Sequence, residues 1–155
     1  ANLVSLGFEL LWPSMEPAYS MEIRPGFISV SLYPGPTREV NAASMIDYIV
    51  RQRKVADDQR DNFDEALGLF YELNATDSGY IGQGRVSLYW TDAKAAEQVI
   101  IECKFMREDE PYTCTQKWVN DGIGSIVYIY YQAAMIVEWK SIKKDIDQFV
   151  NAHKK

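Results

Sequence analysis

The stretch Glu97–Val119 constrains the fold most strongly, because it reads as two neighbouring β-strands that each have one apolar face and one polar face. Apolar and polar side chains alternate with a period of two in both halves, as they do in half-buried strands. The apolar positions are Val99, Ile101, Cys103 and Phe105 in the first half and Tyr112, Cys114 and Trp118 in the second. The stretch therefore predicts an antiparallel β-hairpin with one side against a core.

One register of this hairpin satisfies its aromatic, cysteine and apolar positions together. Its pairs are Phe105 with Tyr112, Cys103 with Cys114, and Val99 with Trp118. Two cysteines that face each other across neighbouring strands suit one disulfide bridge, Cys103–Cys114, which would place the protein in an oxidising compartment. The same placement also accommodates two buried free thiols, so both states stay open at the level of sequence.

Further alternating runs predict an antiparallel sheet of about seven strands. They lie at residues 7–12, 19–24, 27–33, 67–73, 85–90 and 125–131. We expect residues 19–24 and 27–33 to form a hairpin around the tight turn at Pro25-Gly26. The short apolar run 67–73 fits either a strand or a helix by its period, and we favour a strand.

Two segments change to a helical period. Residues 42–55 follow Asn41, a candidate N-cap, and carry apolar side chains on one helical face. Residues 134–152 repeat the pattern with Trp139, Ile142 and Ile146 among the apolar positions. We therefore predict an α+β fold over a single domain of residues 1–155: an antiparallel sheet of about seven strands, a helix after the third strand, and a C-terminal helix packed on the sheet.

The net charge of −6 argues against a nucleic-acid partner, because phosphate binding depends on Lys and Arg. A basic protein surface is the natural electrostatic complement of an acidic chain. No apolar run reaches the length of a transmembrane segment. The sequence begins at Ala1 rather than Met, as would a shortened sequence or a mature protein that has lost a signal peptide or an upstream lipid anchor.

The residue inventory offers little for catalysis. The single histidine, His153, lies near the end of a Lys-rich tail, so a catalytic triad or a histidine zinc site is not expected. The acidic residues of the stretch 57–65 do not have the spacing of the ligands in a calcium-binding loop, so we expect them to form a solvent-exposed acidic surface. Gly79, Gly82 and Gly84 do not open a helix, so they do not form a phosphate-binding loop. We expect no enzyme activity, no metal site and no cofactor.

Two exposed segments are the candidates for binding a partner. The loop 74–84 combines aromatic and small polar residues, a mixture that suits protein recognition, although Tyr80 would equally well fold back on the sheet. The hairpin tip concentrates negative charge, which either keeps the sheet soluble or meets Lys and Arg on a partner. The predicted contact residues are Asp77, Ser78, Tyr80, Ile81 and Gln83 of the loop and Glu108, Asp109 and Glu110 of the tip.

The order of elements resembles that of the PsbP/DcrB-like α+β sandwich. The resemblance rests on a hairpin around Arg24-Pro25-Gly26-Phe27, a helix at 44–55, a meander of strands, and a final helix with Trp139 and Phe149. It implies a non-catalytic adaptor, chaperone or lipoprotein. Small size, acidity and the lack of catalytic groups also look like immunity proteins that bacteria make against secreted antibacterial toxins, such as type VI effectors.

The sequence thus predicts a non-catalytic protein that binds and blocks a cognate secreted effector. The alternative is a structural or assembly adaptor, or a chaperone module, of a bacterial envelope or secretion complex. A disulfide favours the periplasm, and a protein with free thiols would instead be cytoplasmic. We expect a monomer or a small homo-oligomer.

Overall fold

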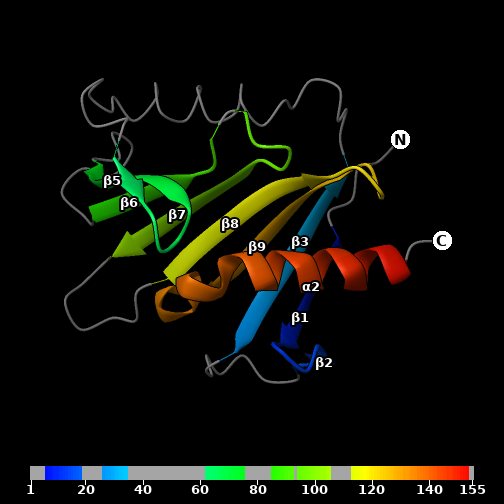
Figure 1. Cartoon of the computed structure of the whole chain (residues 1–155). Coiled ribbons are helices and arrows are strands. Elements are labelled where there is room, and N and C mark those ends of the chain that lie inside the picture. The colour runs from blue at the N-terminus through cyan, green and yellow to red at the C-terminus, as the bar shows by residue number, and fades with distance from the viewer. Residues whose placement is uncertain are drawn as a thin grey trace.

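The computed structural model describes residues 6–18, 26–34, 62–75, 85–92, 94–105 and 113–153, which form one antiparallel sheet with a C-terminal helix across one of its faces (Figure 1). The strands are β1 (Leu6–Leu11), β2 (Glu16–Pro17), β3 (Phe27–Pro34), β4 (Phe63–Asp64), β5 (Leu69–Ala75), β6 (Arg85–Trp90), β7 (Val99–Phe105), β8 (Thr113–Asn120) and β9 (Ser125–Gln132). A 3₁₀ helix, η2 (Ala133–Glu138), leads into α2 (Trp139–Ala152).

The strand order across the sheet is β2-β1-β3-β9-β8-β7-β6-β5-β4, and every neighbouring pair is antiparallel. Strands β4 to β9 form a meander in which each strand pairs with the next along the chain. The last strand, β9, then pairs with β3, which lies far upstream in the sequence. This single non-local pairing joins β1, β2 and β3 to the meander.

The sheet has nine strands rather than the predicted seven. Two of the nine, β2 and β4, contain only two residues each, which is too short for an alternating pattern to show. The predicted strand at 67–73 is confirmed as β5, displaced by two residues toward the C-terminus. The predicted helix at 42–55 lies outside the residues that the structure describes.

Residues 19–24 lie outside the described residues, and the hairpin that we predicted for them with residues 27–33 is contradicted by the partners of β3. Strand β3 pairs with β1 on one side and with β9 on the other, so both of its edges are taken. Gly26 has a positive φ of 89°, and a Cβ atom there would collide with the carbonyl oxygen of Trp12. The Trp12 amide donates a 2.7 Å hydrogen bond to the Gly26 carbonyl. Gly26 therefore allows Trp12, at the end of β1, to approach the start of β3.

Helix α2 covers one face of the sheet with an apolar stripe, as its period predicts. Trp139, Ile142, Ile146 and Val150 are buried in the same core as side chains of β1, β3, β7, β8 and β9. Each fully buried isoleucine stabilises the fold by roughly 1.5–3 kcal/mol. The predicted helix began at Ala134, but the first turns are 3₁₀ and the α-helix begins at Trp139. No helix among the described residues is long and apolar enough to cross a membrane.

Two aspartates fix the position of α2 on the sheet. The indole N–H of Trp118 in β8 donates to Asp147 at 2.8 Å, and that of Trp12 donates to Asp145 at 3.0 Å. Asp147 also accepts a 2.8 Å hydrogen bond from Asn120 and forms an ion pair at 2.8 Å with buried Lys143. These directional contacts set which way the apolar stripe faces, because hydrophobic burial alone is non-directional.

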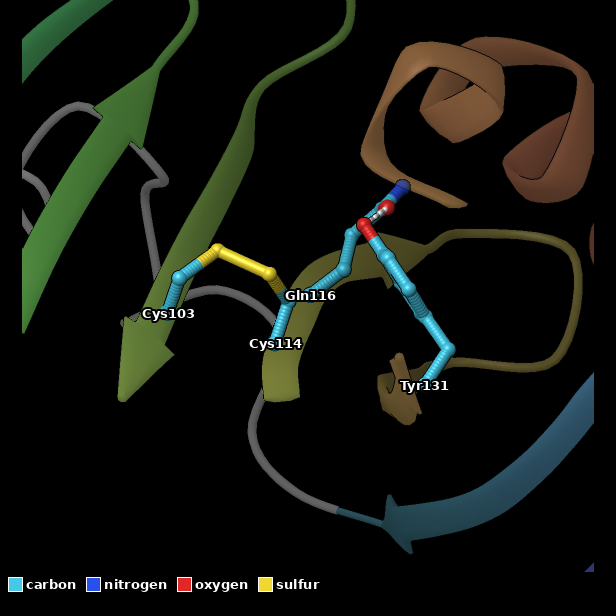
Figure 2. Close-up of a disulfide and its surroundings, with 4 residues drawn as sticks. All are labelled: Cys103, Cys114, Gln116 and Tyr131. Carbon is cyan, nitrogen blue, oxygen red and sulfur yellow. Dashed lines mark hydrogen bonds between the residues drawn. A yellow bond between two sulfur atoms is a disulfide. The ribbon is translucent and has the colours of Figure 1, made fainter. Parts of the chain in front are cut away.

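Of the two states that the sequence left open for the cysteines, the structure contains the disulfide, which joins Cys103 of β7 to Cys114 of β8, and both cysteines are buried (Figure 2). The register is also the predicted one, with Cys103 opposite Cys114 and Val99 opposite Trp118. Tyr112, the expected partner of Phe105, lies outside the described residues. The bridge therefore locks β7 and β8 in the register that the alternating side chains specify.

A buried polar chain lies beside the disulfide, as Figure 2 shows. The hydroxyl of Tyr131 in β9 donates to the side-chain oxygen of Gln116 at 2.7 Å, and the Gln116 amide donates to the Trp139 carbonyl at 3.1 Å. Burial raises the pKa of Tyr131, which keeps this hydroxyl a proton donor. The chain links β9, β8 and the start of α2, and it satisfies buried polar groups that would otherwise be costly.

We expect a Cys103→Ala/Cys114→Ala double variant to lose about 3 kcal/mol of unfolding free energy, because the bridge restricts the unfolded chain over a short loop. Urea unfolding of the oxidised wild type and of the double variant gives this difference. A thiol titration of the unreduced, denatured wild type is the control. Two titratable thiols would show that the bridge does not form.

A matched pair of glycine variants tests the approach of β1 to β3. Gly26→Ala should cost about 3 kcal/mol, because both the positive φ and the Trp12 carbonyl oppose a Cβ atom. Gly124→Ala should cost about 1 kcal/mol, because its φ is also positive but no atom lies within 4 Å of the added carbon. Thermal and urea unfolding measure both costs, and equal costs would contradict the predicted collision.

A second matched pair tests how α2 is held. Asp147→Ala should lower the free energy of unfolding by about 3 kcal/mol, because it leaves Lys143 without its nearest carboxylate and two buried donors without an acceptor. Asp145→Ala removes one indole hydrogen bond and should cost about 1 kcal/mol. Urea unfolding of the two variants would disprove the ranking if Asp145→Ala were the more damaging.

Candidate functional site

The face of the sheet opposite α2 carries a cluster of three tyrosines on β3 and β9, beside polar side chains of the neighbouring strand β8. Side chains alternate between faces along a strand, so the residues between the buried positions of these strands point away from α2. We call the resulting surface the tyrosine face. It consists of Ser29, Ser31 and Tyr33 of β3, Thr115 and Lys117 of β8, and Tyr128 and Tyr130 of β9.

Strand register brings these residues together in rows. Ser31 lies opposite Tyr128, which in turn lies opposite Lys117. Ser29 lies opposite Tyr130, which lies opposite Thr115. Side chains directly opposite each other on antiparallel strands are about 4.5–5.5 Å apart at Cβ, so each row is a continuous contact surface. The tyrosine face thus depends on the non-local pairing of β3 with β9.

Side chains of the tyrosine face contact one another through an edge-to-face ring pair and a cation–π contact. The Tyr33 and Tyr128 rings meet edge to face, with centroids 4.9 Å apart and an interplanar angle of 77°. The ammonium group of Lys117 lies 5.8 Å from the centroid of the Tyr128 ring. Burial raises the pKa of Tyr128, and nearby Tyr33 raises it further. Hydrogen-bond donors and apolar ring surface are therefore held in fixed positions.

Tyr33 and Tyr130 remain exposed despite these contacts, at 44% and 41% of their full surface. Farther along the row of Lys117, the same sheet face is apolar and buried. Lys117 lies opposite Ile100, which is 3% exposed, and the next position in that row is the buried Trp90. Among the described residues, Tyr33 and Tyr130 therefore give this sheet face an exposed aromatic surface at β3 and β9.

The charge of the tyrosine face differs from that of the whole chain. The chain carries a net charge of −6, yet β3, β8 and β9 contain one charged side chain, Lys117, and no Asp or Glu. The exposed Glu9 of β1 extends the row of Ser29 and Tyr130. A partner that binds this face can therefore contact the aromatic rings and form hydrogen bonds with the hydroxyl groups. Its binding does not carry the free-energy cost of removing water from a cluster of carboxylates.

A second feature is an apolar groove of about 330 Å³ at the C-terminal end of α2. Phe8 of β1 packs against Phe149 of α2 in its wall, with ring centroids 5.6 Å apart, and the Phe149 ring lies 4.4 Å from that of His153. His153 Nδ1 lies 2.7 Å from the Phe149 carbonyl oxygen, so this nitrogen is the donor. Of the described residues that line the groove, Ser125 and His153 have polar side chains and the others are apolar.

The predicted contact residues of the 74–84 loop and of the hairpin tip lie outside the described residues. They are Asp77, Ser78, Tyr80, Ile81, Gln83, Glu108, Asp109 and Glu110, and they stay a prediction. Among the described residues, no group of three or more His, Cys, Asp or Glu side chains could hold a metal ion. The tyrosine face was not predicted, although the alternation of Tyr128 and Tyr130 with Val127 and Ile129 is visible in the sequence.

No protein-family model matches the sequence, and no curated protein matches it either. The fold is similar to that of Smlt3025, an immunity protein of the Stenotrophomonas maltophilia type IV secretion system. The two chains are 12% identical, with a TM-score of 0.63 over 94% of this chain and 80% of that chain. The PsbP/DcrB-like likeness is not confirmed, and the similar protein belongs to a type IV system rather than to type VI. This chain shares the fold of a bacterial immunity protein.

Proposed function

We propose that this protein is a non-catalytic immunity protein that binds and blocks a cognate secreted antibacterial effector. The observation that carries this proposal is the fold, which matches that of an immunity protein over 94% of the chain. Fold alone does not fix function, so the proposal needs support from the surface. The tyrosine face supplies it, because exposed, well-ordered tyrosines are characteristic of protein-binding surfaces.

The disulfide supports a periplasmic location for this activity. Disulfides persist in oxidising compartments and are rare in the cytosol. The bridge between Cys103 and Cys114 is buried at the centre of the meander, so it belongs to the folded protein rather than to a reactive surface site. An effector that acts in the cell envelope would meet the protein there.

The acidic hairpin tip Glu108–Glu110 and the loop that carries Tyr80 remain proposed contacts. Together with the net charge of −6, they favour a basic effector surface, because charge complementarity raises the rate of association. The kind of secretion system that delivers the effector is part of the proposal only by analogy with the type IV system of Smlt3025.

Co-expression with the product of the adjacent gene tests the function. The probe is the product of the gene adjacent to that of this chain in its native genome, exported to the periplasm of a bacterial host. We expect it to stop growth, and we expect the exported wild-type chain to restore growth. The purified pair should form a 1:1 complex with Kd of about 100 nM or tighter, measured by interferometry and light scattering.

The matched control is the same chain without an export signal, which should not protect the host if binding occurs in the periplasm. Growth arrest that the exported chain does not relieve, with no complex at micromolar concentrations, would contradict the proposal. A stable homo-oligomer in that experiment would instead favour the assembly-module alternative.

A further inference from the structure

We propose that the tyrosine face is the surface that binds the effector, and that a basic, arginine-bearing surface of the effector docks on it. This inference rests on the proposed function and deepens it by assigning the interface. Its central residues are Tyr33, Tyr128 and Tyr130, which the pairing of β3 with β9 brings side by side.

On the other face of these strands, the apolar groove at the C-terminal end of α2 is open. Elsewhere helix α2 covers that face, with Ile142 and Ile146 fully buried against the sheet and Asp147 hydrogen-bonded to Trp118. A partner that bound there would have to displace a helix held by apolar burial and by charged hydrogen bonds. The tyrosine face, by contrast, already exposes Tyr33 and Tyr130.

The tyrosine face has the properties of an interface centre. Tyrosine gives a large apolar contact area and a hydroxyl group at a low cost in conformational entropy, which is why it dominates binding hot spots. The edge-to-face contact of Tyr33 with Tyr128 and the position of Lys117 over the Tyr128 ring restrict these rings before binding. Less entropy is then lost when a partner docks. Side chains of an open sheet also suit a broad protein surface better than a small molecule.

Charge and ring chemistry together indicate a basic partner. The chain as a whole is acidic, so a cationic protein is drawn toward it at long range. At contact, an arginine side chain can stack on the exposed rings of Tyr33 and Tyr130 and can pair with the exposed carboxylate of Glu9 in the same row as Tyr130. Lys117 over Tyr128 shows that a cation fits against a ring of this face.

Alanine variants of the exposed tyrosines test the interface, with the product of the adjacent gene as the probe. Tyr33→Ala and Tyr130→Ala should each weaken binding about 10- to 100-fold, mainly through faster dissociation. Tyr130→Phe should have a smaller effect, because it keeps the ring. Val137→Ala, at a 70% exposed residue of η2, is the matched control and should bind as the wild type does.

Two further variants keep the test independent of any folding defect in the alanine variants. Ser31→Arg adds a bulky cation to the centre of the face and should weaken binding at least about 10-fold. Glu9→Lys should slow association about two- to fivefold and reduce its salt dependence. Thermal unfolding of each variant separates lost binding from lost folding.

The outcomes separate this inference from the proposed function. If the wild type binds and both tyrosine variants and Ser31→Arg bind equally well, the interface assignment is overturned while the proposed function stands. Faster association of Glu9→Lys would overturn the basic nature of the partner surface. If the wild type does not bind at all, the proposed function fails and the assignment fails with it.

Discussion

The pairing of β3 with β9 is the contact on which the rest of the structure depends. It joins two parts of the chain that are far apart in sequence, the β1–β3 unit and the β4–β9 meander, into one sheet. Helix α2 then spans the junction, since Asp145 accepts a hydrogen bond from Trp12 at the end of β1 and Asp147 accepts one from Trp118 in β8. Both the surface on which α2 packs and the tyrosine face contain residues from the β1–β3 unit and from the β4–β9 meander, so neither surface forms without the β3–β9 pairing.

The two faces of strands β3, β8 and β9 differ in what they contact: one packs in the core and the other carries the tyrosine face. On one face, Val127, Ile129 and Tyr131 of β9 lie in the core that α2 covers. On the other, Tyr128 and Tyr130 of the same strand lie on the tyrosine face beside Tyr33. A disulfide-bridged sheet can therefore hold the tyrosine face in a fixed shape.

Patterns within a few residues were sufficient for most of the local structure. The alternation in Glu97–Val119 correctly predicted the β7–β8 register and placed the two cysteines opposite each other, and the helical period correctly predicted the C-terminal helix. The β3–β9 pairing could not be predicted, because an alternating pattern does not specify which distant strand is the partner. For that reason the sequence pattern favours the nearby run 19–24 as the partner of β3, which in fact pairs with β1 and β9. The exposure of Tyr33 and Tyr130 depends on this pairing, so the candidate site was missed as well.

The proposed interface requires that a bound effector cover the face opposite α2. Hydroxyl-radical footprinting of the chain, alone and in complex with the product of the adjacent gene, tests this requirement because it reports the solvent access of single side chains. We expect oxidation of Tyr33 and Tyr130 to fall several-fold in the complex while that of Val137 is unchanged. Protection of Val137 and the outer side of α2, with Tyr33 and Tyr130 oxidised as in the free chain, would contradict it.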